Sequence, residues 1–211
     1  ISEIDKIVSK SKLTEKDVDA IRKVRGVESS EGILLKSEIV KFKEQTNIIF
    51  VIGVSQEYLD IFGNIDATEV IEGRQLKQGD KFKVVVGYNH VFGDLWDKQA
   101  AVGNSITIEG QEFKIIGVLK KQGNPIDDSS IWVSKDVLAE LLNTGNEESQ
   151  IVAKTSPGFN PDNVAEDIKR ALRKERGEKE GQETFSVQTS SQLLESFNSI
   201  FAVVQAVFVG I

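Results

Sequence analysis

The 211-residue sequence contains no cysteine, no methionine and a single histidine, and each scarcity excludes a class of site. Without cysteine there are no disulfide bonds, no thiolate metal ligands and no cysteine nucleophile. The single histidine, His90, rules out a site built from several imidazoles, and any Ser-His-Asp triad would have to use it. Because the chain lacks methionine and opens on Ile1, we expect it to be processed or cut from a longer product.

Basic residues are outnumbered by acidic ones. The 26 Lys and Arg residues stand against 33 Asp and Glu, which gives a formal charge of −7 and a pI near 5.0. This balance lacks the basic footprint that binding to nucleic acid phosphates requires. The hydrophobic (39%) and charged (28%) fractions are typical of a globular protein with one large domain or two small ones. No G-x-x-x-x-G-K-[ST] motif occurs, so any ATPase must lie elsewhere.

Residues 14–63 are predicted to fold as a helix, a set of strands and a second, short helix. Thr14 is a natural N-cap for the first helix, and Ser55 is one for the second. Between them, Lys36-Ser37-Glu38 suggests a turn. The run 47–54 (NIIFVIGV) is almost continuously apolar and β-branched, which predicts a strand buried on both faces.

Residues 68–148 have a different, β-rich pattern. Two alternating runs, 105–109 and 113–118, lie on either side of Gly110, and this arrangement predicts a β-hairpin. A further short strand is expected before Ser134, which is placed to cap a helix.

From residue 149 onward the α/β style of the first part returns. Asn160 followed by Pro161 is a strong helix-start signal, and 184–188 is predicted to be a strand. Basic residues crowd the C-terminal half of this helix, namely Lys169, Arg170, Arg173, Lys174 and Arg176. They would suit an anion-binding patch, but we favour the plainer interpretation, in which cations complement the helix dipole.

The end of the chain is apolar on all sides. Residues 200–211 (IFAVVQAVFVGI) contain one polar residue and no charge. A bilayer span needs about 20 such residues. Two interpretations stay open: a C-terminal core helix, or the opening of a transmembrane helix, which we favour because no polar face is left.

No residue is assigned a catalytic, cofactor-binding or metal-binding role. His90 lies in a predicted short helix and is expected to have a packing or surface role. The acidic pairs Asp127-Asp128 and Glu147-Glu148 offer oxygen ligands for a cation, but neither has the alternating ligands of a calcium loop, so turn and surface roles are favoured. The polar, glycine-containing loops 121–130 and 177–183 are better candidates for contacts with a partner.

A series of turn glycines and alternating aliphatic residues resembles a known family. The series consists of Glu72-Gly73-Arg74-Gln75-Leu76 leading to Asp80, then Val84-Val85-Val86-Gly87, Val102-Gly103 and the hairpin ending in Ile115-Ile116-Gly117-Val118. Also fitting are Arg25-Gly26-Val27-Glu28, the Gly53-Val54-Ser55 step with Tyr58, and the run from Ser191 onward. In order and spacing they look like the MacB-like periplasmic core domain of ABC-transporter permeases of the MacB, LolC/LolE and FtsX type. The resemblance covers nearly the whole chain.

This resemblance implies an α+β fold with two lobes, inserted between the first and second membrane helices on the extracytoplasmic face of a multi-pass membrane protein. A porter-like α/β lobe would comprise 1–67 plus 149–190, and a β-rich, sabre-like lobe would comprise 68–148. Residues 191–211 would form a helix leading into a truncated transmembrane segment.

The resemblance also implies a transport role without catalysis in this chain. ATP and Mg would be bound by a partner ABC ATP-binding subunit, and their motion would reach the outer domain of a permease dimer, a process called mechanotransmission. An adaptor or envelope protein would bind at the outer lobe. Two alternatives stay open: an FtsX-type regulator of a cell-envelope hydrolase, and a free soluble extracellular binding module.

Overall fold

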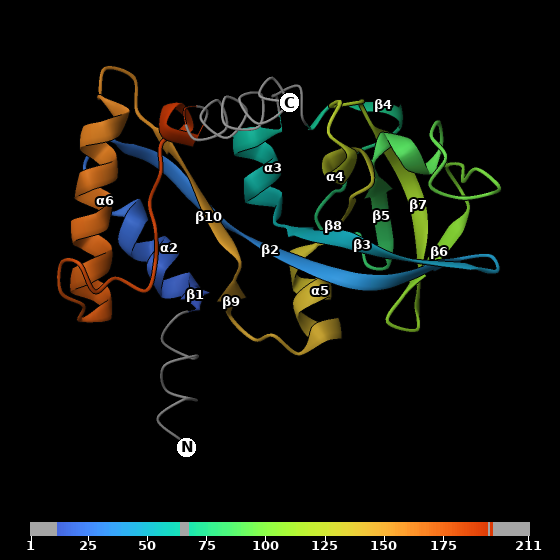
Figure 1. The fold of residues 1–211 in the computed structure, drawn as a ribbon, viewed down its shortest axis with the longest axis horizontal. Coiled ribbons are helices and arrows are strands. Elements are labelled where there is room, and N and C mark those ends of the chain that lie inside the picture. Colours follow the sequence, from blue (N-terminus) through green and yellow to red (C-terminus); the bar gives the residue numbers. More distant parts are fainter. Residues whose placement is uncertain (1–11, 64–67, 194, 196–211) are drawn as a thin grey trace, which may run out of the picture. The chain divides into compact units, whose positions relative to one another are not determined.

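The structure is a computed structural model and describes residues 12–63, 68–193 and 195. The elements in chain order are β1 (Leu13–Thr14), α2 (Glu15–Arg22), β2 (Val27–Phe42), β3 (Gln45–Val54), α3 (Gln56–Phe62), β4 (Val70–Gly73), β5 (Lys83–Val86), η2 (Tyr88–His90), β6 (Ser105–Ile108), β7 (Gln111–Leu119), α4 (Pro125–Asp128), β8 (Ile131–Ser134), α5 (Lys135–Leu142), β9 (Glu147–Glu148), β10 (Gln150–Thr155) and α6 (Pro161–Arg176). Strands and helices are mixed along the chain, which confirms the expected α+β class (Figure 1).

The chain divides into two compact units. Unit 1 comprises Asp19–Ser30 and the described residues from Ala153 onward, and unit 2 comprises Lys12–Val18 and Glu31–Val152. As expected for a two-lobed fold, one unit draws on both ends of the chain. The boundaries of the units differ from the expected 1–67 plus 149–190, because β3 and the part of β2 from Glu31 onward pair with strands from the middle of the chain and belong to unit 2.

The strands of unit 2 close into a ring. β2 pairs with β3, β3 with β8, β8 with β5, β5 with β7, β7 with β6, and β6 returns to β2. The β3–β8 and β5–β7 pairs are parallel and the others are antiparallel. Since each strand of the ring pairs with another strand of the ring on either side, the ring is a small closed barrel, seen around β5 and β7 in Figure 1.

Side chains from all strands of the ring fill the barrel. The inward-facing buried residues are Val40, Phe42, Ile49, Val51, Val84, Val86, Ile106, Ile108, Phe113, Ile115, Val118, Ile131 and Val133. Leu138 of α5 and Trp96 of the segment after η2 belong to the same hydrophobic cluster. Burial of this set on folding, at roughly 25 cal/mol per Å² of apolar surface, is the main source of stability of unit 2.

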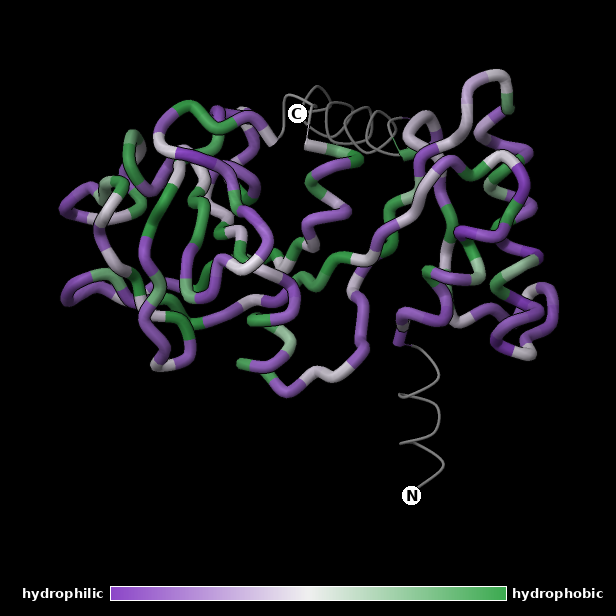
Figure 2. Tube along the Cα trace, turned by 180° about the vertical axis from the view of Figure 1, so that it is seen from behind, coloured by the Kyte–Doolittle hydropathy of each residue, from purple (hydrophilic) through white to green (hydrophobic). Residues whose placement is uncertain are grey.

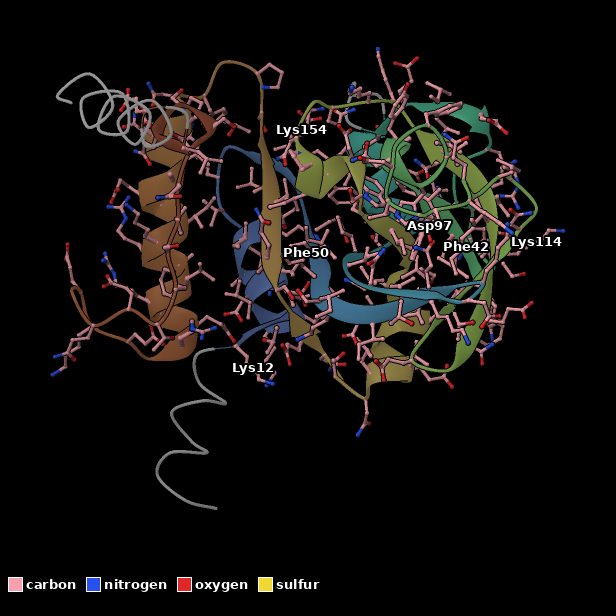
Figure 3. The ribbon with its side chains drawn as sticks, turned by 45° about the vertical axis from the view of Figure 1, so that its right-hand side comes forward. Lys12, Phe42, Phe50, Asp97, Lys114 and Lys154 are labelled. Atoms are coloured by element: carbon pink, nitrogen blue, oxygen red, sulfur yellow. The ribbon has the colours of Figure 1, made fainter. Side chains whose placement is uncertain are left out.

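The outer face of β3 contradicts the prediction of a strand buried on both faces. Ile49 and Val51 are buried, but Ile48 is 78% exposed and Phe50 is also exposed, so the strand alternates. Phe42 on the inner face and Phe50 on the outer face are both labelled in Figure 3. A second cluster, which includes Leu59 of α3, covers only the far end of this face.

The predicted turn at Lys36-Ser37-Glu38 is also wrong. β2 runs without interruption from Val27 to Phe42 and pairs with β3 from Leu34 to Phe42. The chain reverses instead at Lys43, whose φ is 53°. The polar residues at 36–38 misled the prediction because one of them, Lys36, has a specific partner, described below, rather than a place in a loop.

Local start signals predicted where the helices begin, although Ser134, expected to cap α5, makes no side-chain hydrogen bond to that helix. The Thr14 backbone N–H donates to Asp17 Oδ2 at 2.8 Å, and Ser55 Oγ accepts from the Tyr58 backbone N–H at 2.9 Å. Asn160 Oδ1 accepts the backbone N–H groups of the first turn of α6. These caps satisfy donors that a helix leaves unpaired at its start, which is why the sequence signal is reliable.

Unit 1 contains the amphipathic helix α6, whose buried stripe consists of Val164, Ala165, Ile168 and Leu172. The rest of α6 is hydrophilic, as Figure 2 shows. At Gly26, with φ of 91°, a Cβ would lie 2.5 Å from Phe159, so the backbone approaches this segment too closely for any side chain. The described residues 184–188 form no strand, contrary to the prediction. Their side chains bond locally, as at Thr184, whose backbone N–H donates to Glu178.

The predicted transmembrane segment within 200–211 lies outside the described residues. Across 12–63, 68–193 and 195, none of the helices is long and apolar enough to cross a membrane.

Candidate functional site

His90 is buried among structural partners. Trp96 Nε1–H, which can only donate, donates to His90 Nδ1 at 3.2 Å, so the imidazole proton lies on Nε2 and is directed at Ser129 O, 2.9 Å away. Burial lowers the pKa of His90 to about 4, although the Ser129 and Ser130 backbone contacts act in the other direction. The side chain is therefore neutral and both ring nitrogens are in use, in keeping with the expected packing role.

The loop 121–130 is held rigidly. The Asp128 carboxylate accepts the backbone N–H groups of Gln122 (2.6 Å) and Gly123 (3.0 Å). At the same time Asn124 caps α4 by accepting the Ile126 N–H. Asp128 is buried and thus closes the loop, as the favoured turn role requires.

The loop 177–183 and the basic end of α6 are tied together by ion pairs. Arg173 Nη1 lies 2.8 Å from Glu183 Oε1, and Arg176 Nε lies 3.2 Å from Glu178 Oε1. Lys169 pairs within the helix. These contacts neutralise much of the basic charge, which supports helix termination over an anion-binding patch.

The glycine–arginine string that carries the family resemblance has a structural role. At Gly73, φ is 77° and a Cβ would lie 2.2 Å from the Ile116 carbonyl oxygen, so only glycine lets β4 approach β7 this closely. Arg74 then binds Asp80 through both terminal nitrogens, at 2.6 and 3.0 Å, and Lys83 binds the same carboxylate at 2.7 Å. The hydrogen bonds from Arg74 hold the pKa of Asp80 well below its usual range.

The most unusual polar site is a cluster of lysines and glutamates in unit 2, which we call the Glu148 cluster. Its members are Lys12, Glu31, Lys36, Lys135, Glu147 and Glu148 (Lys12 is labelled in Figure 3). They come from the residue before β1, from β2, from the start of α5, and from β9, which pairs with β1. The topology of unit 2 gathers them from distant parts of the sequence.

The two adjacent glutamates of this cluster differ sharply. Glu147 accepts one lysine on each carboxylate oxygen, Lys12 and Lys36, both at 2.6 Å. Burial raises the pKa of Glu147, but the two lysines outweigh it and the net direction is down. Glu148 has a side chain only 3% exposed, and its Oε1 lies 2.7 Å from Lys135 Nζ.

The environment of Glu148 favours its neutral form. Burial raises the pKa of Glu148; Lys135 acts in the opposite direction, and Glu15 and Glu31 raise the pKa further. Its carboxyl group packs against Gly32, where a Cβ would lie 2.3 Å from Glu148 Cδ. This difference cannot be predicted from the sequence, because two successive glutamates in a polar stretch carry no signal that one of them is buried.

None of the His, Asp and Glu side chains described by the structure form a group of three or more that could hold a metal ion. The acidic pairs 127–128 and 147–148 instead bind backbone N–H groups and lysines.

A closed barrel unit and a smaller unit built on one long helix, with the strands β2 and β10 contributing to both, define a two-lobed α+β domain. The chain belongs to the MacB-like periplasmic core domain family, whose model matches residues 4–171. It is accordingly a periplasmic-type, extracytoplasmic domain of an ABC transporter permease.

Two permeases are similar in sequence. The uncharacterized ABC transporter permease MJ1507 of Methanocaldococcus jannaschii is 30% identical over 199 residues, covering 94% of this chain and 48% of the relative. The uncharacterized ABC transporter permease YknZ of Bacillus subtilis is 25% identical over 116 residues, covering 54% of this chain and 28% of the relative. The chain thus spans about half the length, or less, of these relatives.

Two solved structures share the fold. The extracellular domain of the noncanonic ABC-type transporter YknZ from Gram-positive bacteria has a TM-score of 0.66 at 22% identity, covering 89% of this chain and 95% of that one. The periplasmic region of MacB from Actinobacillus actinomycetemcomitans has a TM-score of 0.67 at 16% identity, covering 88% and 83%. At these identities the likeness concerns the fold alone.

Proposed function

We propose that this domain transmits motion from the membrane part of an ABC transporter permease to events outside the membrane, in substrate export or extraction. ATP and Mg would bind to a partner ATP-binding subunit, and two permease copies would act together. The domain would have no catalytic activity of its own. Membership of the permease domain family, and relatives that are permeases, favour this role over a free binding module.

The observation that carries the proposal is how the backbone links the two units. β2 changes from unit 1 to unit 2 between Ser30 and Glu31, and β10 changes back between Val152 and Ala153. These two strands are neighbours in the same sheet. A displacement of unit 1 would therefore reach unit 2 through hydrogen-bonded strands and not through slack loops.

Unit 2 is built to move as one piece. Its barrel is closed, and its loop 121–130 is fixed to the barrel side by bonds such as Gly87 N–H to Ser130 O at 2.8 Å. A rigid, exposed loop loses little entropy when a partner binds. We propose this loop and, as a separate site, loop 177–183 of unit 1 as candidate contacts for an adaptor or envelope protein.

The test uses spin labels in the full-length permease with its ATP-binding subunit in nanodiscs. This chain contributes no native cysteine, so Lys43→Cys in unit 2 and Lys179→Cys in unit 1 give defined labelling sites within it. Labelled protein is mixed with unlabelled protein so that only distances within one copy are measured. We expect the 43–179 distance distribution to change when ATP is added to a non-hydrolysing ATPase variant.

A matched control places both labels in unit 2, with Lys43→Cys and Glu140→Cys, and that distance should stay constant. Identical 43–179 distributions with and without ATP would contradict the proposal. Co-purification of a cell-envelope hydrolase, with its activity depending on ATP, would support the FtsX-type alternative.

A further inference from the structure

The carboxyl group of Glu148 is buried, and only one of its two oxygens accepts a hydrogen bond from the described residues. Its Oε1 lies 2.7 Å from Lys135 Nζ, whereas Oε2 is inaccessible to solvent and has no hydrogen-bond partner among the described residues. Lys135 Nζ also donates to Gly32 O at 3.2 Å, so it is shared. An ionised carboxylate accepts bonds at both oxygens and is costly to bury with only one bond made.

Three elements bring charged side chains near this carboxyl group. Lys135 comes from α5, Glu31 from β2 and Glu15 from α2. The other lysines of the cluster, Lys12 and Lys36, bind the neighbouring Glu147. Lys135 is the cation that Glu148 contacts, so ionisation of Glu148 would place a further negative charge near Glu15 and Glu31 in a buried site.

The geometry points to Glu148 as a proton-binding group whose protonation stabilises the packing of β9 on β2 and α5. Protonation removes the excess charge while Oε1 still accepts from Lys135. Loss of the proton leaves a charged oxygen, Oε2, without a partner, and the carboxyl group is then driven toward water. The contact between the Glu148 carboxyl group and the backbone of Gly32 would separate first. Gly32 has no side chain that could fill the space left by the carboxyl group.

The neighbouring backbone would report this opening. Ser149 N–H donates to Ile33 O at 2.9 Å, and Ser149 Oγ both accepts from Leu35 N–H and donates to Leu35 O. These bonds hold the segment between β9 and β10 against β2. An extracytoplasmic domain experiences the external pH, so the external pH would set how firmly this segment is held.

The first test compares Glu148→Gln with Glu147→Gln by urea unfolding between pH 4 and pH 8. For Glu148 the pKa is raised on folding, so the wild type loses stability relative to E148Q as the pH rises above 4.5. The ratio of their unfolding constants should change by up to about tenfold per pH unit within that window. For Glu147 the pKa is lowered, so the advantage of the wild type over E147Q should shrink as the pH falls. Parallel profiles for E148Q and the wild type would overturn the inference.

A second measurement needs only the wild type and remains decisive where E148Q fails to fold. The side-chain carboxyl carbon of Glu148, followed by NMR, should titrate above the ordinary glutamate value of 4.5. Amide hydrogen exchange at Ser149 and Leu35, corrected for intrinsic rates, should show lower protection after Glu148 ionises. A Glu148 midpoint at or below 4.5, or protection unchanged across it, would refute the role.

Discussion

His90 offers the sharpest test of the structure, since its environment makes the stability of the protein depend on pH in a defined direction. The Nδ1 atom accepts the Trp96 indole N–H, so a proton added there would meet a donor and break that bond. Nε2 already carries a proton directed at Ser129 O. The folded protein therefore resists protonation of His90, whereas the unfolded chain does not.

The magnitude follows from the pKa of His90, which falls from 6.5 to about 4 on folding. As the pH decreases from 7.5, the unfolded chain binds a proton near 6.5 and the folded protein binds it only near 4, so stability declines between these values. At about 1.4 kcal/mol per pKa unit, the loss is ~2 kcal/mol at pH 5 and ~3 kcal/mol below pH 4. This change of stability with pH is opposite to the change that Glu148 causes over part of the same pH range.

The assay must therefore isolate His90. We expect the unfolding free energy of His90→Gln, which keeps a donor toward Ser129 but cannot take a charge, to fall by ~2 kcal/mol less than that of the wild type between pH 7.5 and pH 5. Because His90 is the only histidine, its imidazole signals in NMR spectra are unambiguous and report both the tautomer and the pKa. An imidazole midpoint near 6.5, or a proton on Nδ1, would refute the reasoning.

Three further predictions test the local structure by chemical unfolding. Gly73→Ala should lower the unfolding free energy by about 3 kcal/mol, because it adds a backbone clash to a left-handed φ. The control Gly79→Ala, at a similar φ of 84° but with open space around it, should lower it by only about 1 kcal/mol. Equal losses would contradict the close approach of β4 to β7. Asp80→Asn should lower the unfolding free energy by about 2 kcal/mol at pH 7, a modest loss because Arg74 is partly exposed. This difference should vanish as the pH falls well below 3.8, since the pKa of Asp80 is lowered in the fold and its carboxylate stabilises the fold only while it is ionised. Asn160→Ala should cost about 1 kcal/mol by removing the cap of α6, and an unchanged midpoint would count against that cap.

Features fixed by a few neighbouring residues could be predicted from the sequence. The hairpin of β6 and β7 follows from alternation around a turn in which Glu109 and Gly110 have φ of 47° and 78°. The helix starts at Ser55 and Asn160 follow from side chains that bond to the next turn. Because these signals depend on neighbouring residues alone, they can be recognised without knowledge of the tertiary structure.

Features fixed by distant parts of the chain could not be predicted in this way. Nothing near residues 36–38 shows that β2 continues through them, because Lys36 is held by Glu147, 111 residues away. The exposure of Ile48 likewise reflects tertiary packing, since the hydrophobic cluster that contains Leu59 of α3 does not include it. The burial of Glu148 requires Gly32 and Lys135, which no spacing rule connects to it.

The closed barrel has a mechanical consequence. β2 is bonded along its length to β3 from Leu34 to Phe42, and near its end to β6. The bonds of an antiparallel pair run perpendicular to the strands. A force along β2 would therefore shear all of these hydrogen bonds at once. A force across the strand would instead break them one after another. The barrel would resist tension along β2 far more strongly than peeling of β4, which lies at the sheet edge and pairs with β7 alone among the described strands.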